Sequence, residues 1–323
     1  MNMQILGTGS ELPKYILTND ELTTIVDTSD EWIKERTGIG RRHISKGETV
    51  ASLAAEACKK ALSDAGQSAD KIDIIIVATC SPELFLPCCA CQVQALIDAD
   101  NAVAFDLNAA CSGFLFALNT AYSYFAAGIY KNALIVGAEV LSKIVDWSDR
   151  GTCILFGDGA GAVYVQANES SSDNYSFVQH ANGSKGMVLT CGARDLNNPI
   201  HKEETIKKYV EMDGREIFSF AVRQVSACIN EALDKANIGK DEIDYYILHQ
   251  ANLRIIEGIA KRLGEDISKF PSNLNNVGNM SSAAIPVLLD ECKRSGLISK
   301  GQRIVLSGFG AGLTYGASVI EIS

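Results

Sequence analysis

A cysteine stands where a short apolar run gives way to a helical pattern. Residues 103–107 predict a buried strand, and apolar residues recur at helical spacing after Cys111. Unpaired backbone N–H groups in the first turn of that helix, together with the helix dipole, favour a thiolate over a thiol. Cys111 is therefore a candidate nucleophile. An inert core cysteine is the alternative, because free cysteines are often buried.

Two further residues of catalytic type also lie between a strand and a helix. His249 follows the apolar run Y-Y-I-L, and Asn279 precedes a helix that we expect to start near Ser281. In α/β folds, ligand sites gather at strand ends and at the seams between domains. We therefore expect Cys111, His249 and Asn279 to share one site. A histidine satisfied by its structural surroundings is the alternative for His249.

The chain contains an internal repeat. Several residues of segment 61–76 meet an identical residue in segment 232–247, and each pair is separated by 171 positions. The same shift places Asn108 on Asn279, so the register holds over a long stretch of chain. Repeated strand-helix-strand patterns of this kind indicate a duplicated α/β unit.

The repeat also indicates where the chemistry lies. The shift places Cys111 on Ser282, so the candidate nucleophile is not duplicated. We expect an N-terminal half over residues 1–170 that carries the cysteine. A C-terminal half over residues 171–323 would carry the histidine and the asparagine, with one shared site between the halves.

Composition indicates a globular enzyme in a reducing compartment. The chain has 323 residues, 47% of them hydrophobic and 21% charged, and no leader-like start. Because ten cysteines accompany this start, we expect free thiols and a cytoplasmic location. A net charge of −10 argues against nucleic-acid binding. Cys88 and Cys91 have C-x-x-C spacing, but no second pair follows, so we expect core packing and no metal.

The stretch from Leu107 to Tyr130 contains no charged residue, which raises the possibility of a membrane span. Polar residues interrupt it at Asn108, Ser112, Asn119, Thr120 and Ser123. We therefore predict a central helix buried on all sides, and no membrane contact.

Aromatic and basic residues form two further candidate sites. Trp32 and Arg36 are four positions apart on an expected helix, and such a pair suits a nucleotide base and its phosphates. A half-buried aromatic beside a surface arginine is the alternative. Arg36, Arg41 and Arg42 form one basic spot, and Arg254, Lys261 and Arg262 form another on one face of an expected helix.

These residues resemble the β-ketoacyl-[acyl-carrier-protein] synthase III family of the thiolase-like fold. The resemblance spans essentially the whole chain. It rests on I-L-G-T-G-S, D-T-S-D-E-W-I, A-A-C-S-G-F, D-R-G-T, F-G-D-G-A-G-A, H-Q-A-N, N-x-G-N-x-S-S-A and G-F-G-A-G-L-T-Y-G. It implies a five-layer α-β-α-β-α fold of two duplicated halves, which is usually a homodimer. It also implies a catalytic triad of Cys111, His249 and Asn279.

The resemblance implies an acyltransferase that initiates fatty acid biosynthesis without a cofactor. Cys111 would take an acyl group from acyl-coenzyme A. His249 and Asn279 would stabilise the enolate that forms as malonyl-acyl carrier protein loses carbon dioxide. The backbone N–H groups of Cys111 and Ala311 would hold the oxyanion. Relatives commonly have glycine where this chain has Ala311, but alanine still supplies the N–H.

The resemblance also implies the binding residues. Coenzyme A would contact Thr28, Trp32, Arg36, Arg150 and Asn252, with the adenine between Trp32 and Arg150. The acidic acyl carrier protein would dock on Arg254, Lys261 and Arg262, where basic charge steers an acidic partner.

The acyl pocket would involve Phe156 and Leu86, the latter reaching into the partner subunit. Relatives often have phenylalanine where this chain has Leu86. We therefore hypothesise a primer range wider than acetyl, to be compared across acetyl-, butyryl- and isobutyryl-coenzyme A.

Other classes fit less well. A cysteine hydrolase would not show the repeat, and its elbow would need a glycine two residues before the nucleophile. A degradative thiolase would need a second cysteine near the C-terminal glycine-rich loop, and none follows Cys292. A hydroxymethylglutaryl-coenzyme A synthase would need a glutamate base, which the sequence does not locate. A non-enzymatic relative would lack part of the triad. A relative that condenses other acyl groups for a specialised metabolite remains open.

Overall fold

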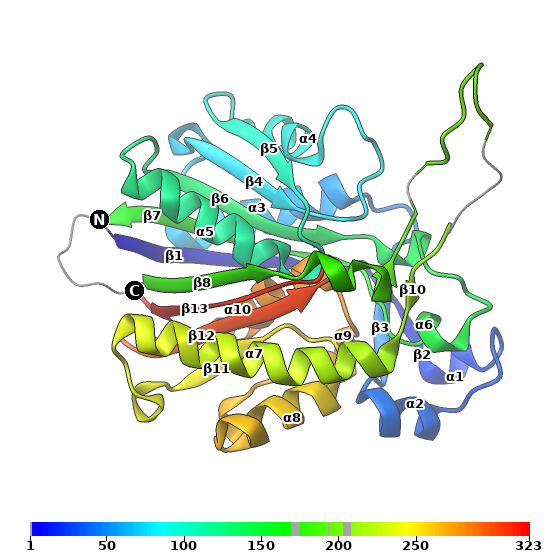
Figure 1. The fold of residues 1–323 in the computed structure, drawn as a ribbon. Coiled ribbons are helices and arrows are strands. Elements are labelled where there is room, and N and C mark those ends of the chain that lie inside the picture. The colour runs from blue at the N-terminus through cyan, green and yellow to red at the C-terminus, as the bar shows by residue number, and fades with distance from the viewer. Residues whose placement is uncertain (1, 169–174, 193, 203–207) are drawn as a thin grey trace.

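Two mixed β-sheets organise the chain (Figure 1). The computed structural model describes residues 2–168, 175–192, 194–202 and 208–323. The five-stranded sheet has the order β1-β7-β6-β4-β5, and the four-stranded sheet has the order β11-β12-β13-β8. Their strands are β1 (Asn2–Glu11), β4 (Ile74–Ala78), β5 (Val103–Leu107), β6 (Asn132–Glu139), β7 (Gly159–Asn168), β8 (Tyr175–Ala181), β11 (Tyr245–Leu248), β12 (Arg303–Gly310) and β13 (Thr314–Glu321).

Helices cover both sheets and also separate them. Buried side chains of α5 (Gly113–Ala126) and α10 (Ala284–Arg294) share one core with strands of both sheets. Helices α3 (Val50–Ala65) and α4 (Cys89–Leu96) pack on the outer face of the first sheet. Helices α7 (Gly214–Ala236) and α8 (Leu253–Leu263) pack on the outer face of the second. The predicted five layers are confirmed (Figure 1).

Short elements connect these layers. Two ribbons pair β2 (Tyr15–Thr18) with β3 (Arg41–Ile44) and β9 (Leu189–Thr190) with β10 (Glu211–Met212). The short helices are α1 (Asn19–Leu22), α2 (Asp30–Thr37), α6 (Arg150–Cys153) and α9 (Leu274–Val277). Single 3₁₀ segments are η1 (Ala69–Lys71), η2 (Ala110–Ser112), η3 (Leu141–Lys143), η4 (Gly183–Val188), η5 (Lys240–Glu242), η6 (Ile267–Lys269) and η7 (Ser281–Ala283).

The sequence repeat is also a repeat of structure. The bounds of η1 and η5, of η2 and η7, and of β6 and β12 each differ by 171 positions. Helices α3 and α7 end at the corresponding residues Gly66 and Asn237, both in the left-handed conformation. The predicted boundary between residues 170 and 171 lies outside the described residues.

Side chains cap the first three helices. Ser29 caps α2 and Thr49 caps α3. Thr18 caps α1, and its side chain and that of Glu21 form a reciprocal capping box. The Asn19 amide donates to Asp30 Oδ1 at 2.9 Å and to the Ile39 carbonyl at 2.8 Å.

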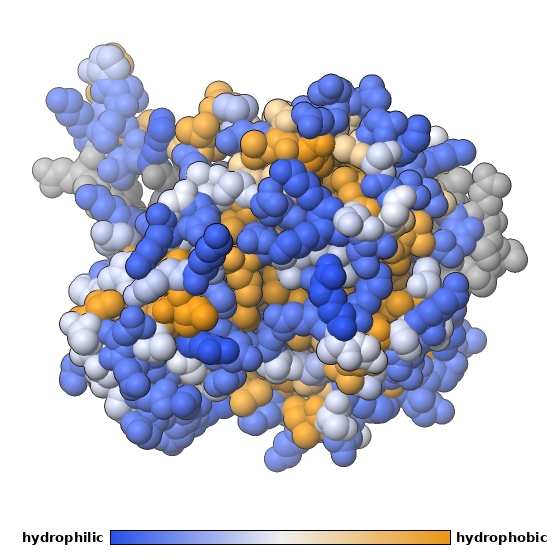
Figure 2. Space-filling model, turned by 180° about the vertical axis from the view of Figure 1, so that it is seen from behind, coloured by the Kyte–Doolittle hydropathy of each residue, from blue (hydrophilic) through white to orange (hydrophobic). Residues whose placement is uncertain are grey.

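Helix α5 is the predicted central helix. Its Asn119 is buried, and Asn119 Oδ1 accepts hydrogen bonds from the Tyr175 hydroxyl and from the Ser318 hydroxyl. The Asn119 oxygen is therefore satisfied inside the protein, whereas its Nδ2 is buried without a partner among the described residues. Among the described helices, none is both long enough and apolar enough to cross a membrane. Figure 2 shows a mainly hydrophilic face on which some apolar side chains gather.

The two halves approach so closely at β6 that the position tolerates no side chain. A Cβ atom built on Gly137 would lie 2.1 Å from the Ser282 carbonyl oxygen, which belongs to η7 of the other half. We predict that Gly137→Ala lowers the free energy of unfolding by about 1–3 kcal/mol, because backbone must move. Gly214→Ala is the control, since a Cβ there meets nothing within 4 Å. Equal urea-unfolding midpoints for the two variants would contradict this interpretation.

Candidate active site

Cys111 lies in the turn between β5 and α5, as predicted. It is the central residue of η2, and Ala110 before it has a φ of 45°. The Asn108 side-chain carbonyl accepts a hydrogen bond from the Ala110 amide at 3.1 Å, which holds the turn. The corner therefore presents Cys111 at the start of a largely buried helix.

The C-terminal half closes tightly on this corner. A Cβ built on Gly310, at the end of β12, would lie 2.6 Å from the Cys111 amide nitrogen. Glycine is therefore required at this position, and it brings the turn that carries Ala311 beside the nucleophile. The Ala311 carbonyl accepts from the Thr314 hydroxyl at 3.1 Å, and that hydroxyl lies 2.8 Å from the hydroxyl of Ser112.

The Cys111 thiol is not the ready thiolate that its helix position suggested. Burial raises its pKa to about 12. Hydrogen bonds from the Ser281 hydroxyl and from the Cys111 amide oppose it but do not cancel it. The helix N-terminus therefore offsets only part of the cost of burying a charge.

His249 follows β11 directly and faces the same seam. Only 3% of the residue is exposed, and burial lowers its pKa to about 3, so the imidazole is neutral at physiological pH. Its ring packs edge-on against Phe309, with the ring centroids 5.6 Å apart. Nδ1 is buried without a hydrogen-bond partner among the described residues. A satisfied structural histidine would not leave this nitrogen unpaired.

The turn that begins at Asn279 repeats the conformation of the turn that precedes Cys111. Its side-chain carbonyl accepts from the Ser281 amide at 2.8 Å, and Ser281 has a φ of 49°. Because Oδ1 is engaged in this way, Nδ2 is the group that Asn279 can offer to a substrate. The three predicted residues thus surround the end of β12: Gly310 approaches the Cys111 amide, Gly308 approaches the His249 Cβ, and Ser281 links Asn279 to the thiol.

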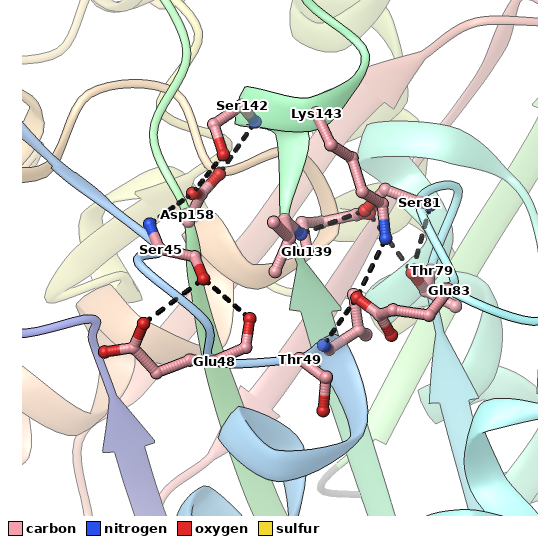
Figure 3. A network of polar contacts seen from close by, with 12 residues as sticks. Ser45, Glu48, Thr49, Thr79, Ser81, Glu83, Glu139, Ser142, Lys143 and Asp158 are labelled. Carbon is pink, nitrogen blue, oxygen red and sulfur yellow. Dashed lines mark hydrogen bonds and ion pairs between the residues drawn. The ribbon is translucent and has the colours of Figure 1, made fainter.

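A buried carboxyl lies beneath the site, and the sequence analysis did not identify it. Glu139 ends β6, and its carboxyl accepts from the hydroxyls of Ser81 at 2.5 Å and Thr79 at 3.2 Å (Figure 3). The Ser282 hydroxyl lies 2.9 Å from its other oxygen. Burial raises the pKa of Glu139. The available signal was a glutamate that directly continues the apolar strand A-L-I-V-G-A.

The residues expected to bind the nucleotide of coenzyme A lie close together around Trp32. The guanidinium carbon atoms of Arg36 and Arg150 lie 4.4 Å and 4.7 Å from the centroid of the Trp32 ring. Arg150 Nη1 also donates to the Asp27 carbonyl at 2.8 Å. The buried Thr28 hydroxyl has no partner among the described residues, as expected for a group that awaits a ligand. Arg150 now contacts the ring, so an adenine between them would displace this arginine.

Helix α8 joins the nucleotide residues to the second basic spot. Asn252 caps α8 through a 2.9 Å bond from the Arg254 amide, and its Nδ2 donates to the Arg36 carbonyl at 3.0 Å. Arg254, Lys261 and Arg262 are exposed, and none pairs with an acidic group of the described residues.

The prediction that Arg36, Arg41 and Arg42 form one basic spot is wrong for Arg42. Arg42 is fully buried, where its guanidinium donates to Asn19 Oδ1 and to the Ile154 carbonyl, both at 2.8 Å. Burial lowers its pKa to about 10. Arg42 therefore belongs to the core of this region and offers no charge to a ligand.

The two expected pocket residues have opposite exposures. Phe156 is buried and forms a β-bridge with Asn279, which places it beside the site. Leu86 is 86% exposed and precedes Pro87 through a cis peptide bond. Leu86 therefore points away from its own subunit's core.

Comparison with known proteins shows the family of the chain. Residues 105–186 match the family model 3-oxoacyl-[acyl-carrier-protein (ACP)] synthase III, and residues 233–322 match the model of its C-terminal part. The chain is 47% identical to the β-ketoacyl-[acyl-carrier-protein] synthase III of Clostridium acetobutylicum, over 99% of this chain and 98% of that protein. Identity to the synthase of Clostridium botulinum strain Okra is 49%, over 99% of this chain and 98% of that protein.

A solved structure shows the same fold. The crystal structure of 3-oxoacyl-[acyl-carrier-protein] synthase III from Aquifex aeolicus is 43% identical to the chain, covers 99% of both chains and superimposes with a TM-score of 0.92. The similarity in sequence and in fold extends over 99% of the chain. The chain therefore belongs to the β-ketoacyl-[acyl-carrier-protein] synthase III family of condensing acyltransferases, with a thiolase-like fold.

Proposed function

We propose that this enzyme condenses an acyl-coenzyme A primer with malonyl-acyl carrier protein, by decarboxylative Claisen chemistry, to give 3-oxoacyl-acyl carrier protein. The reaction initiates fatty acid biosynthesis in the cytoplasm. The observation that carries the proposal is the seam itself: Cys111 of one half faces the Gly310 turn, His249 and Asn279 of the other half.

The first step transfers the acyl group to Cys111. The sulfur attacks the thioester carbonyl while the thiol loses its proton, and coenzyme A departs as the carbon–sulfur bond breaks. A pKa raised to about 12 means that an acceptor must take this proton as the attack proceeds. Neutral His249 can accept it and pass it to the sulfur of the departing coenzyme A, which leaves His249 neutral again. The amides of Cys111 and Ala311 stabilise the oxyanion, and one such donor is typically worth about 10²–10³ in rate.

The second step makes the new carbon–carbon bond. The malonyl thioester carbonyl accepts hydrogen bonds from neutral His249 and from Asn279 Nδ2. The bond to the carboxylate then breaks, carbon dioxide leaves, and the enolate attacks the acyl group on Cys111. The bond between the acyl carbon and the Cys111 sulfur breaks, 3-oxoacyl-acyl carrier protein is released, and the thiolate takes up a proton from solvent. The thioester and the departing carbon dioxide supply the activation, so no cofactor is needed.

Coenzyme A binds through its nucleotide at Trp32. The adenine stacks between Trp32 and Arg150, Thr28 donates or accepts a hydrogen bond with the base, and Arg36 meets the phosphates. Asn252 lies between these residues and the catalytic site. The unpaired Thr28 hydroxyl and the two guanidinium groups over Trp32 support this assignment.

The acyl carrier protein binds α8 through Arg254, Lys261 and Arg262. These cations lie on a protein with a net charge of −10, and they begin two residues after Asn252 of the coenzyme A path. One entrance thus serves both pantetheine-bearing substrates.

The enzyme works as a homodimer in which Leu86 and Phe156 shape the acyl pocket. Strand β5 is at the edge of its sheet, and Val103 on it is 48% exposed. The loop before α4 exposes Leu84, Phe85 and Leu86. An apolar sheet edge beside an apolar loop is a surface that a second copy can cover. Leucine at position 86 allows primers longer or more branched than acetyl.

Cys111 is expected to carry the acyl group of the primer. After incubation with acetyl-, butyryl- and isobutyryl-coenzyme A, intact-protein mass spectrometry should show one acyl adduct per chain. Cys111→Ser should abolish the adduct, whereas Cys292→Ser, at a buried thiol of α10, should retain it. An adduct that survives Cys111→Ser would refute the assignment.

Adducts restricted to acetyl would remove the wider primer range, and adducts only with other acyl classes would favour specialised metabolism.

Trp32→Ala should weaken the binding of coenzyme A thioesters because it removes the contact with their nucleotide. We expect the KM for acetyl-coenzyme A to rise about tenfold, since stacking on an aromatic is worth about 1–3 kcal/mol per base. The kinetics with acetyl-pantetheine, which lacks the nucleotide, should not change. An equal loss with both donors would show that Trp32 has a structural role instead.

Charge reversal on α8 should affect only the carrier protein. We expect Arg254→Glu with Lys261→Glu to raise the KM for malonyl-acyl carrier protein at least about tenfold at low salt, and less at high salt. Acylation by acyl-coenzyme A should remain. Lys300→Glu, an exposed charge outside α8, is the control. Equal effects of the α8 and control variants would contradict the docking site.

A further inference from the structure

The corner that carries the nucleophile exists twice in this fold. In both copies an asparagine carbonyl accepts from the amide two residues on, at 3.1 Å from Ala110 and at 2.8 Å from Ser281. Ala110 and Ser281 both have positive φ, and a 3₁₀ turn leads into a buried helix in both copies. Ser282 occupies the place in the second corner that Cys111 occupies in the first.

The two corners differ in the residue that faces them. Gly310 faces Cys111 and places no side chain in the first corner. The repeat places Glu139 at the position equivalent to Gly310, and its carboxyl lies against the Ser282 hydroxyl at 2.9 Å. The second corner is thus filled by a carboxyl from the end of β6.

The hydrogen-bond pattern around Glu139 identifies its protonation state. Oε2 accepts from Ser81 Oγ at 2.5 Å, from Thr79 Oγ1 at 3.2 Å and from the Cys80 amide at 3.1 Å. The Ser282 hydroxyl lies 2.8 Å from the Ala78 carbonyl and 2.9 Å from Oε1 of Glu139. The Cys80 amide and thiol also lie 3.3 Å and 3.4 Å from Oε1. Because the Ser282 hydroxyl has one hydrogen, it can donate to the Ala78 carbonyl and keep its contact with Oε1 only when Oε1–H donates to Ser282.

The charges around Glu139 are consistent with a neutral carboxylic acid. Among the described residues, no lysine, arginine or histidine pairs with Glu139, and the titratable groups that face it are the thiols of Cys80 and Cys111. Full burial without a cation favours the neutral carboxylic acid.

We propose that Glu139 is a positioning residue, a neutral carboxylic acid that donates to Ser282 and thereby holds Asn279 in place for decarboxylation. Glu139 joins η7 to the turn after β4 at residues 79–81. Asn279 depends on η7 because its side chain accepts from the Ser281 amide. Cys111 is held by its own helix and by the approach of Gly310, and it meets η7 through the Ser281 hydroxyl, so it depends less on Glu139 than Asn279 does. This inference rests on the proposed role of Asn279.

The test compares two substitutions in the two half-reactions. Glutamine reproduces the neutral acid, because its amide can donate to Ser282 while its carbonyl accepts the other three bonds. Glu139→Gln should therefore decarboxylate malonyl-acyl carrier protein within about threefold of wild type, and Glu139→Ala should lose at least about tenfold. Acylation of Cys111 should change less than threefold in both. Glu83→Gln, whose carboxyl pairs with Lys143 at 2.8 Å, is the control.

Other results of the same comparison would contradict the proposal. A loss in Glu139→Gln as large as in Glu139→Ala would show that the group is a carboxylate, and an active Glu139→Ala would show that it positions nothing. Equal losses in both half-reactions would indicate a general structural role. Ser282→Ala should reproduce the selective loss, and it serves if Glu139→Ala does not fold.

Crystal structures separate this inference from the proposed function. Glu139→Gln should keep the 2.8 Å bond between Asn279 and Ser281, and Ser282→Ala should lose it. An unchanged bond in Ser282→Ala would overturn the positioning role. A wild-type enzyme inactive in both half-reactions would instead overturn the proposed function and leave this structural reading intact.

Discussion

The close approach of two backbones at the seam between the halves is the constraint on which the rest of the structure depends. Gly137 of β6 and Gly310 of β12, which lie on strands related by the repeat, each allow one half to press on the 3₁₀ turn of the other. Neither position has room for a Cβ atom. Steric exclusion thus fixes where the nucleophile lies relative to the histidine and asparagine more firmly than any single hydrogen bond does.

Burial at this seam determines the chemistry that the residues can perform. It raises the pKa of the Cys111 thiol and lowers the pKa of His249, so both are neutral in the resting protein. A neutral histidine can accept a proton from the thiol, and it can donate one hydrogen bond to a carbonyl. The same low-dielectric setting strengthens the hydrogen bonds offered to an oxyanion or an enolate. Reactivity therefore arises when substrate enters, not from a preformed ion pair.

Sequence patterns were informative where the chain itself encodes the geometry. The repeat indicated two similar halves, and the strand-helix corners located Cys111, His249 and Asn279, because periodicity and local turns reflect short-range sterics. The prediction of a thiolate was wrong, since desolvation depends on how the second half covers the corner. Arg42 was misplaced for a similar reason: only tertiary structure shows that its charge is buried. Glu139 was missed because its partners come from distant segments, near residues 80 and 282.

The central claim is that Cys111 of one half carries the acyl group and that Asn279 of the other half acts in decarboxylation. The two half-reactions of Asn279→Ala test this claim most directly. Acylation of Cys111 by acyl-coenzyme A should proceed within about tenfold of wild type, whereas decarboxylation of malonyl-acyl carrier protein should fall by about 10²–10³. Asn276→Ala, an exposed asparagine of α9, should leave both rates unchanged. Loss of acylation to the same extent, or decarboxylation at the wild-type rate, would contradict the account.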